Sequence, residues 1–383
     1  MAPATNSLGE MEARLAEIKQ KERMLRKWMD ARRIQAVALS LQSSFAWATA
    51  GGDSKIGMAT EMGCATLIIT GSSEKSGGSY LLVNNIEAQR LQAEQLPPGH
   101  YIPLIYPWYQ PDQAEQRIKE LAGSGSLAGD TPLYQAQAVL PELARLRYAL
   151  HPSEQERYRI IGADAAQVAR CTLQEIQTGQ SEYEMAAIAA HHLLDTELQP
   201  ALILVAADER IAQYRHPLPT ENRLKRAVLL VICARRWGLI ASVSRLAHFG
   251  TLPDDMARRH RAVCRVDAEL ISRTRAGAEV KEIFQAAQQV YGQTGFPDEW
   301  KLHHQGGATG YTSRDYKGSP DSSEVVLMGQ AFAWNPSIAG TKSEDTVLVT
   351  NAMPEILTAD PDWPMITVET VRGSINRPDI LIR

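Results

Sequence analysis

Residues 331–350, AFAWNPSIAGTKSEDTVLVT, contain two apolar runs of strand type joined by a short polar segment. The runs AFAWNPS and DTVLVT have the composition of β-strands, and the polar segment places Lys342, Glu344 and Asp345 just before the second run. A carboxylate at the mouth of a strand can bind a metal ion, accept a proton or hold an ammonium group. A solvated turn also carries such residues, so the neighbouring segments decide between these interpretations.

A first histidine segment precedes this stretch, where QYRHPLPTENR covers residues 213–223. His216 lies between Arg215 and Pro217, just ahead of a hydrophobic strand-type run. A histidine held beside a proline-bounded turn can act as a general acid or base, because its unperturbed pKa is close to neutral. Taken alone, the segment is more simply an ordinary loop with a histidine in it.

A second histidine segment, WKLHHQGGATGYTSRDY, covers residues 300–316. His303 and His304 come before a glycine pair, and glycine allows a ligand to approach the backbone closely. A glycine-rich hairpin with solvated histidines is the alternative. Aromatic residues of the kind that line pockets flank the histidines: Trp300, Tyr311 and Tyr316. They favour the interpretation as a pocket.

The first 148 residues alternate between helical and strand-type patterns. Apolar residues recur at helical spacing from about Leu8 to Arg33, and the runs AVALSL, CATLIIT and SYLLVNN follow with glycine and serine between them. Helical patterns return in IEAQRLQAEQL and QAEQRIKELAG. This alternation predicts an α/β domain.

The remaining residues predict a second, mixed domain. A long helix is expected to start at Pro152 and Ser153, with Glu156 completing a capping signature. Two more helices, in EYEMAAIAAHHLL and EVKEIFQAAQQVY, each follow a glycine and an acidic residue, which suggests an internal duplication or a chance echo. Strand-type runs are ALILVAA, AVLLVICAR and LIASVSRLAHF. We therefore expect α+β structure in this half.

The order of these segments resembles the peptidase M24 group, which includes methionine aminopeptidase, proline-specific aminopeptidase, prolidase and creatinase. His216 resembles the group's first conserved histidine, and His304 its metal-ligand histidine before a glycine-containing turn. Glu344 resembles the final metal-ligand glutamate in the pattern G-x-[RK]-x-E-D. The resemblance implies an α/β, creatinase-type N-terminal domain in residues 1–148. It implies an α+β pita-bread domain, as in creatinase and the aminopeptidases, in residues 149–383.

The chain departs from the group's pattern at the metal ligands. Metal-dependent members carry aspartates in IDxG and SDxTR patterns, whereas residues 229–246 read LLVICARRWGLIASVSRL. Neutral residues stand at these positions, which are Ile232 or Cys233 for the first aspartate and Val243 or Ser244 for the second. Asn335 replaces the glutamate of the IEPG-like motif. A dinuclear centre needs bridging carboxylates, so we predict neither a catalytic metal nor another cofactor.

The resemblance to creatinase, a member that works without a metal, implies roles for the remaining residues. His216 would be the general acid and base, while His304 and Glu344 would orient water or hold a cationic part of the substrate. Arg314 would bind a substrate carboxylate as a bidentate pair. The residues expected to bind substrate are Arg215, Arg245, Arg314, Tyr311, Asn335 and Lys342.

The sequence therefore predicts a metal-independent, creatinase-like hydrolase that cleaves a C–N bond in a small nitrogen compound bearing a carboxylate. Three alternatives stay open. The chain can be an Xaa-Pro dipeptidase or aminopeptidase with an unorthodox metal site, or a lyase on the same scaffold. It can also be a binding module without catalysis, as in the M24-like domain of a histone chaperone subunit.

Composition limits the partners. The net charge of −4 gives no basic excess for nucleic acid, and no apolar run is long enough to span a membrane, so we expect a cytoplasmic protein. By resemblance we expect a homodimer, in which the segment SFAWATAGGD, residues 44–53, reaches the other subunit's pocket. A plain hairpin within the N-terminal domain is the simpler interpretation of that segment.

Overall fold

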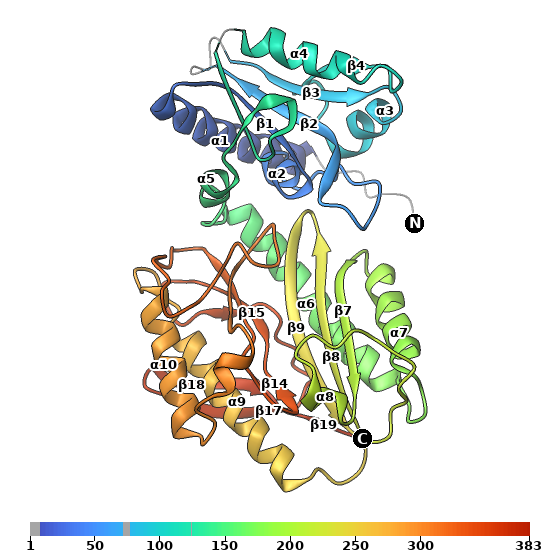
Figure 1. The fold of residues 1–383 in the computed structure, drawn as a ribbon, viewed down its shortest axis with the longest axis vertical. Helices are drawn as coiled ribbons and strands as arrows, with labels where there is room; N and C mark the ends of the chain where they lie inside the picture. Colours follow the sequence, from blue (N-terminus) through green and yellow to red (C-terminus); the bar gives the residue numbers. More distant parts are fainter. Residues whose placement is uncertain (1–7, 72–76, 124) are drawn as a thin grey trace. The chain divides into compact units, whose positions relative to one another are not determined.

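The computed structural model describes residues 8–71, 77–123 and 125–383. The chain forms two compact units, Met1–Arg147 and Tyr148–Arg383, and each is described by itself (Figure 1). None of the helices in the described ranges is both long enough and apolar enough to cross a membrane.

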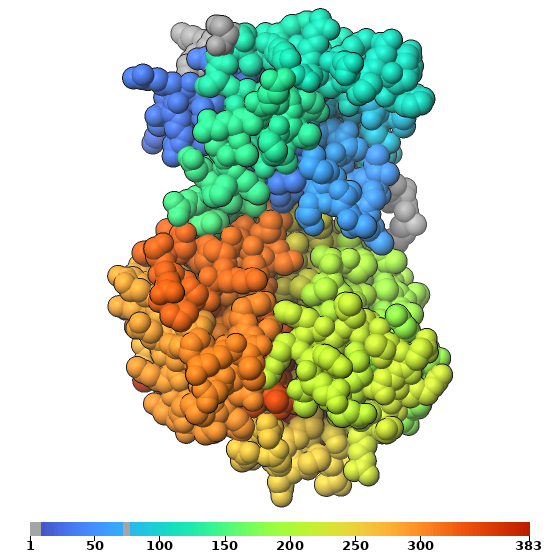
Figure 2. All heavy atoms as spheres, in the orientation of Figure 1, coloured from blue at the N-terminus to red at the C-terminus, as the bar shows by residue number. Residues whose placement is uncertain are grey.

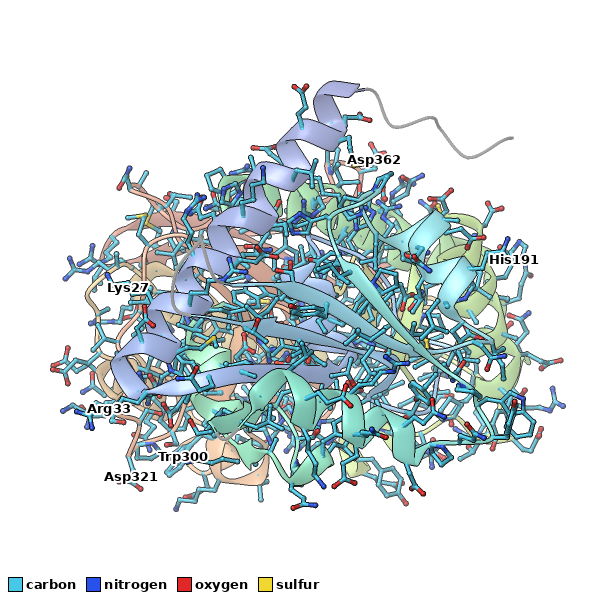
Figure 3. All side chains as sticks on the ribbon, turned by 90° about the horizontal axis from the view of Figure 1, so that it is seen from above. Lys27, Arg33, His191, Trp300, Asp321 and Asp362 are labelled. Carbon is cyan, nitrogen blue, oxygen red and sulfur yellow. The ribbon has the colours of Figure 1, made fainter. Side chains whose placement is uncertain are left out.

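The first unit has one sheet of order β4-β3-β2-β1-β5-β6, in which β1 pairs antiparallel with β2 and parallel with β5. The strands are β1 (Ile34–Leu41), β2 (Met62–Thr70), β3 (Ser79–Asn84), β4 (Ile102–Tyr106), β5 (Ser126–Gly129) and β6 (Gln137–Ala138). The helices are α1 (Leu8–Arg32), α2 (Gln42–Ala48), α3 (Ala88–Arg90), α4 (Asp112–Ala122) and α5 (Leu140–Arg145). Lys27 and Arg33 mark the end of α1 in Figure 3. The opening helix and the α/β class are thus confirmed, but α1 is not clearly amphipathic, because its buried side carries Glu17, Lys21 and Glu22 beside the apolar residues.

The segment at residues 44–53 is not the hairpin considered above. Residues 42–48 form α2, and all seven of its side chains are buried. The helix begins where the Asp130 carboxylate accepts the backbone N–H groups of Ser40 and Leu41 at the end of β1. It ends at Thr49, whose hydroxyl donates to the carbonyl of Phe45. Apolar burial of Phe45 and its neighbours therefore outweighs the turn signals of the following glycines.

The second unit contains two larger sheets, each covered by helices (Figure 1). One sheet has the order β19-β9-β8-β7 and packs against α6 and α7, and the other has the order β11-β10-β12-β15-β16. The helices are α6 (Pro152–Glu175), α7 (Glu182–Asp195), α8 (Arg210–Gln213), α9 (Asp254–Arg273) and α10 (Val280–Gln293). The strands of the two sheets are β7 (Gln199–Ala207), β8 (Ala227–Arg236), β9 (Leu239–His248), β10 (Gly306–Thr309), β11 (Tyr316–Lys317), β12 (Ala331–Trp334), β15 (Asp345–Leu348), β16 (Glu355–Ile356) and β19 (Leu381–Ile382). Two hairpins complete the unit, β13 (Ser337–Ile338) with β14 (Thr341–Lys342), and β17 (Met365–Thr370) with β18 (Gly373–Pro378).

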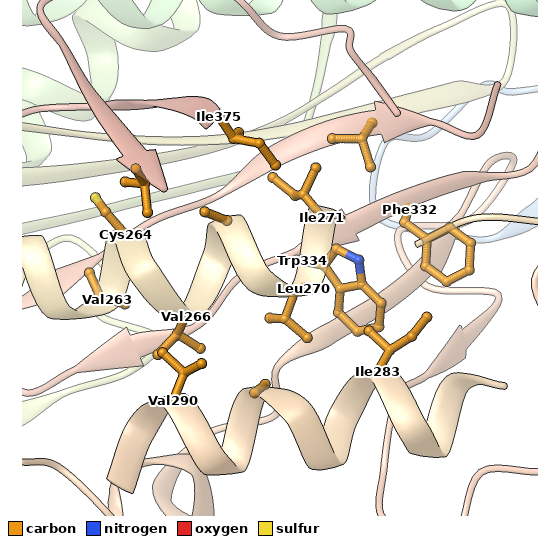
Figure 4. Packing of buried hydrophobic residues seen from close by; sticks show 14 of the residues in the cluster. Val263, Cys264, Val266, Leu270, Ile271, Ile283, Val290, Phe332, Trp334 and Ile375 are labelled. Carbon is orange, nitrogen blue, oxygen red and sulfur yellow. The ribbon is translucent and has the colours of Figure 1, made fainter. Parts of the chain in front are cut away.

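The core of this unit lies between α9, α10 and the strands β10, β12 and β15 (Figure 4). Phe332 and Trp334 of β12 stack in this core, with ring centroids 5.4 Å apart. The indole N–H of Trp334 donates to the Thr274 hydroxyl over 2.8 Å, which satisfies its buried donor. Trp334 therefore fixes which face of β12 points toward α9 and α10.

The long helix starts at Pro152 as expected, but its capping residues are not the ones expected. His151 is the N-cap of α6, and its side chain accepts the backbone N–H of Ser153. Glu154 completes the capping box by accepting the backbone N–H of His151. Pro152 takes the first helical position, where its missing N–H costs nothing, so the cap must precede it.

Candidate functional site

The two sheets of the second unit meet where β9 approaches β15. The backbone N–H of Ser244 donates to the carbonyl of Glu344 over 3.2 Å, and that of Ser242 donates to the Thr346 hydroxyl over 2.8 Å. These bonds place the β9 side chains next to the polar segment that precedes β15.

The strand register decides which residues face this junction. Cys233 pairs directly with Ser242 across β8 and β9, and their Sγ and Oγ atoms are 3.3 Å apart. Ser244 lies two residues further along the same face, where its hydroxyl donates to Glu344 over 2.5 Å. Ile232 and Val243 pair on the opposite face and so are not at the ligand positions. The side that faces Glu344 therefore carries Cys233, Ser242 and Ser244.

Glu344 is buried within a cluster of protein cations. Its Oε2 lies 2.8 Å from Lys342 Nζ and its Oε1 lies 3.0 Å from Arg314 Nη2. Burial alone would raise the pKa of Glu344, but Lys342 and Arg314 outweigh it and hold that pKa at about 2. The carboxylate is therefore ionised at neutral pH, and its charge is balanced by the protein itself.

Three histidines lie close together in the same unit. One ring nitrogen from each of His216, His303 and His304 lies within 4.8 Å of the other two. His216 Nε2 and His303 Nε2 are 3.2 Å apart, and His303 Nδ1 lies 3.2 Å from the Ser337 hydroxyl. His303 is buried, whereas His216 is exposed. Figure 2 shows a hollow on this unit between the yellow-green and the orange parts of the chain, which are the colours of residues near 216 and 303.

The tautomer of His304 follows from its neighbour. The backbone N–H of Gly306 donates to His304 Nδ1 over 3.2 Å, so in the neutral ring the proton is on Nε2. His304 therefore offers a hydrogen-bond donor at Nε2.

All three imidazoles are neutral near pH 7. Burial, followed by the charge of Lys342, lowers the pKa of His303 to about 2. Burial and Arg314 lower the pKa of His304 to about 4, and burial together with Lys342 also lowers that of His216. A neutral imidazole can accept a proton or donate a hydrogen bond, so both roles are open to this group.

The donor set does not fit a dinuclear centre for hard divalent ions. Such a centre needs bridging carboxylates, and Cys233, Ser242 and Ser244 offer neutral groups where Glu344 is already paired with two cations. The three histidines are a second possible ligand group. A metal-ligating histidine donates its other ring N–H outward, whereas Nδ1 of His304 accepts a hydrogen bond. His304 thus fits hydrogen bonding better than metal ligation, and without it the group offers two ligands, His216 and His303.

Two residues expected to bind substrate belong to the scaffold instead. Arg245 is 1% exposed and pairs with Asp345 over 2.8 Å, and Tyr311 is 0% exposed with its hydroxyl donating to Glu154 over 2.5 Å. Both are corrections, because neither side chain can reach a ligand. Arg215 is engaged as well, since it pairs with Glu299 over 2.5 Å.

The other expected residues lie around the junction. Arg314 and Lys342 contact Glu344, and the backbone N–H of Asn335 donates to the carbonyl of Gln305 next to His304. Sequence reasoning singled out His304 from the histidine pair, while His303 is the one within hydrogen-bonding distance of His216. Ser337 was missed altogether. Its position two residues after Asn335, in the same short segment, was the available signal.

The comparisons with known proteins agree with this architecture. The model for metallopeptidase family M24 matches residues 156–351. Among solved structures, an Xaa-Pro dipeptidase from Bacillus anthracis has 18% identity and a TM-score of 0.74, and the match covers 96% of this chain and 100% of that one. A dipeptidase from Pyrococcus horikoshii has 15% identity and a TM-score of 0.75, with 96% and 100% covered. The N-terminal domain of a FACT complex subunit from Cicer arietinum has 12% identity and a TM-score of 0.68, with 90% and 96% covered. No curated protein sequence matches the chain. At these identities the structural likeness concerns the fold.

Proposed function

Because the chain belongs to metallopeptidase family M24, a family of hydrolases with the pita-bread fold, we propose that it hydrolyses a C–N bond in a small nitrogen compound bearing a carboxylate. His216 is the general acid and base, and the reaction proceeds without the dinuclear centre, in the manner of creatinase. The observation that carries this proposal is the contact between exposed His216 and buried His303. It makes His216 a neutral base that a ligand can reach and that the hydrogen bond with His303 orients.

The proton follows from the hydrogen-bond partners. When His303 Nδ1–H donates to the Ser337 hydroxyl, its Nε2 is free to accept from His216 Nε2–H. His216 Nδ1 then carries the lone pair that takes a proton from water. The imidazolium that forms keeps its hydrogen bond to His303, and it returns the proton to the leaving nitrogen.

The cation cluster supports the metal-independent part. A hydrolase must stabilise negative charge that develops on the substrate oxygen. Lys342 and Arg314 lie at Glu344, beside the strands whose aspartates are lost, and they place fixed positive charge there. His304 adds a neutral N–H donor, as worked out from its bond with Gly306. Positive charge and donors are thus supplied by the chain.

The experiment is a turnover screen with lactams, cyclic amidines and N-acyl amino acids as substrates. We expect turnover that survives dialysis against a chelator and falls at least about a hundredfold in His216→Gln. His192→Gln is the matched control, because His192 is a half-buried imidazole of α7 that pairs with Glu175 at the end of α6. Parental rates in His216→Gln would remove the proposed base. Stoichiometric divalent metal with chelator-sensitive turnover would remove the metal-independent mechanism.

The same base can also serve an elimination. Reaction in water labelled with heavy oxygen separates the two chemistries, because hydrolysis places solvent oxygen in the product and elimination does not. Absence of label in a product formed with His216 intact would assign the chain as a lyase.

A further inference from the structure

Asn335 carries a buried amide whose oxygen lacks a protein partner. The residue is 3% exposed, and its Oδ1 has no hydrogen-bond partner among residues 8–71, 77–123 and 125–383. Buried side-chain oxygens in folded proteins nearly always accept a hydrogen bond, and an unsatisfied one costs about 1–3 kcal/mol. The Asn335 oxygen is unsatisfied at the junction that carries the other candidate residues, so we expect a ligand to donate a hydrogen bond to it.

The strand pairing shows where this amide points. Trp334 pairs with Asp345 across β12 and β15, and both side chains lie on the face toward α9. Successive side chains along a strand point to opposite faces. Asn335 and Glu344, which follow and precede this pair, therefore share the other face, where Glu344 meets Ser244 and Arg314.

The backbone places Asn335 between two parts of the site. Its N–H donates over 3.0 Å to the carbonyl of Gln305, the residue after His304. On the other side, one step beyond the pair Trp334–Asp345, it comes opposite Glu344. A ligand contacting Asn335 thus comes within the region bounded by His304 and the cation cluster.

We propose that Asn335 recognises a neutral N–H group of the ligand, and that the ligand is a cyclic amide or urea with an acceptor next to that N–H. This inference rests on the proposed function and names its substrate class. Asn335 Oδ1 accepts the ligand N–H, and its own amide N–H groups can donate to the neighbouring acceptor, as paired amides do.

Electrostatics separate this class from amines. A protonated amine at Asn335 would lie beside the positive charges of Lys342 and Arg314, and the Glu344 carboxylate is already paired with both. Like charges in a buried site repel strongly. A neutral N–H meets no such penalty. This replaces the expectation that His304 and Glu344 hold a cationic group, since His304 also presents a donor at Nε2.

The test is equilibrium binding of two matched probes, pyroglutamate and N-methylpyroglutamate, measured by calorimetry without turnover. The N-methyl probe lacks the N–H and otherwise keeps the lactam and carboxylate. Leaving a buried acceptor unpaired lowers affinity by about 1–3 kcal/mol, so we expect wild-type protein to bind pyroglutamate roughly 5- to 150-fold more tightly. In Asn335→Leu this ratio should fall to about one, with both probes bound weakly.

Asn376→Leu is the matched control, because Asn376 lies in the separate β17–β18 hairpin and its Oδ1 accepts from Thr367. It should leave the ratio unchanged. If Asn335→Leu fails to fold, the comparison of the two probes on wild-type protein still decides.

Equal affinity of the two probes would overturn the proposal, as would tighter binding of the cationic amine proline, or no binding of either probe at millimolar concentration. The outcome is separable from the proposed function. Discrimination without any hydrolysis would leave the recognition by Asn335 standing and remove the hydrolase. Hydrolysis that depends on His216 but ignores N-methylation would do the reverse.

Discussion

The buried ion network behind the site gives the sharpest stability prediction. Arg377 is 0% exposed, and its Nη2 lies 2.5 Å from Asp267 and 2.6 Å from Asp345. Asp345 pairs in turn with Arg245 over 2.8 Å. Arg377→Met removes the guanidinium but keeps most of the side-chain volume, so Asp267 loses its only ion-pair partner within the described residues.

The cost has two parts. Burial raises the pKa of Asp267 to about 6 even with Arg377 in place, so without Arg377 the carboxyl is protonated near pH 7. Because the wild-type pKa is already raised, this protonation accounts for about 1.4 kcal/mol of the loss at pH 7. The rest comes from the lost ion pairs, since removing one partner of a buried ion pair costs roughly 3–5 kcal/mol in all. We therefore expect Arg377→Met to lower the unfolding free energy of the second unit by about 4 kcal/mol.

Asp267 also decides how the loss of stability in Arg377→Met changes with pH. Since the folded variant holds a proton that folded wild type releases above about pH 6, the loss shrinks by about 1.4 kcal/mol in all as the pH falls from 7, and levels off once wild-type Asp267 is protonated too. Asp267→Asn in the Arg377→Met background removes the carboxyl and should restore part of the stability. The two changes are coupled because the residues touch.

The assay is urea unfolding of the full chain, with the second unit followed by hydrogen–deuterium exchange in peptides from α9. The double variant serves as the internal control. A loss below about 1 kcal/mol for Arg377→Met, a loss that does not shrink at lower pH, or additive losses in the double variant would each refute the reasoning.

Three further predictions concern the site. Gly306→Ala should lower the melting temperature by several degrees, because φ of this residue is +91° and a Cβ would lie 2.1 Å from the carbonyl oxygen of Ala333. The control is Gly292→Ala in α10, where a Cβ would meet open space, and it should leave the melting temperature unchanged or raise it slightly in the same thermal scan. Glu344→Gln should lower the unfolding free energy by about 3–5 kcal/mol in urea unfolding, since it removes the carboxylate that pairs with buried Lys342 and half-buried Arg314. A loss within error of zero would show that the two cations relax into solvent. The unfolding free energy should fall as the pH drops below about 6.5, because the unfolded chain then protonates histidines that stay neutral in the folded protein. It should fall further below about pH 4.5, because the unfolded chain then protonates Glu344, whose pKa in the folded protein is about 2. Urea midpoints that do not decrease between pH 7 and pH 4 would contradict this prediction.

Much of the fold followed from local patterns. The opening helix, the strand-type runs and the α+β class of the second half are confirmed, because apolar spacing reports directly on burial. The resemblance to the peptidase M24 group is confirmed as well. The hairpin predicted for residues 44–53 was wrong. The turn residues after α2 are visible in the sequence, whereas the complete burial of α2 is not.

The candidate site was recovered only in part, for a geometric reason. A shift of one residue in a strand moves every side chain to the other face, so the sequence could not choose between Val243 and the serines beside it. Arg245 looked like a ligand-binding cation because its partner Asp345 is a hundred residues away. Contacts of that separation depend on how the two sheets meet, which no local pattern encodes.

The positive charge in the cluster of Lys342, Glu344 and Arg314 does not depend on the concentration of any free ion. Exchangeable ions are shared among all the proteins of a compartment, and a site that depends on them is filled only as far as the free concentration allows. Positive charge carried on side chains is present in each molecule from the moment it folds. The amount of this charge at the junction is therefore set by synthesis of the chain alone, and metal starvation does not change it.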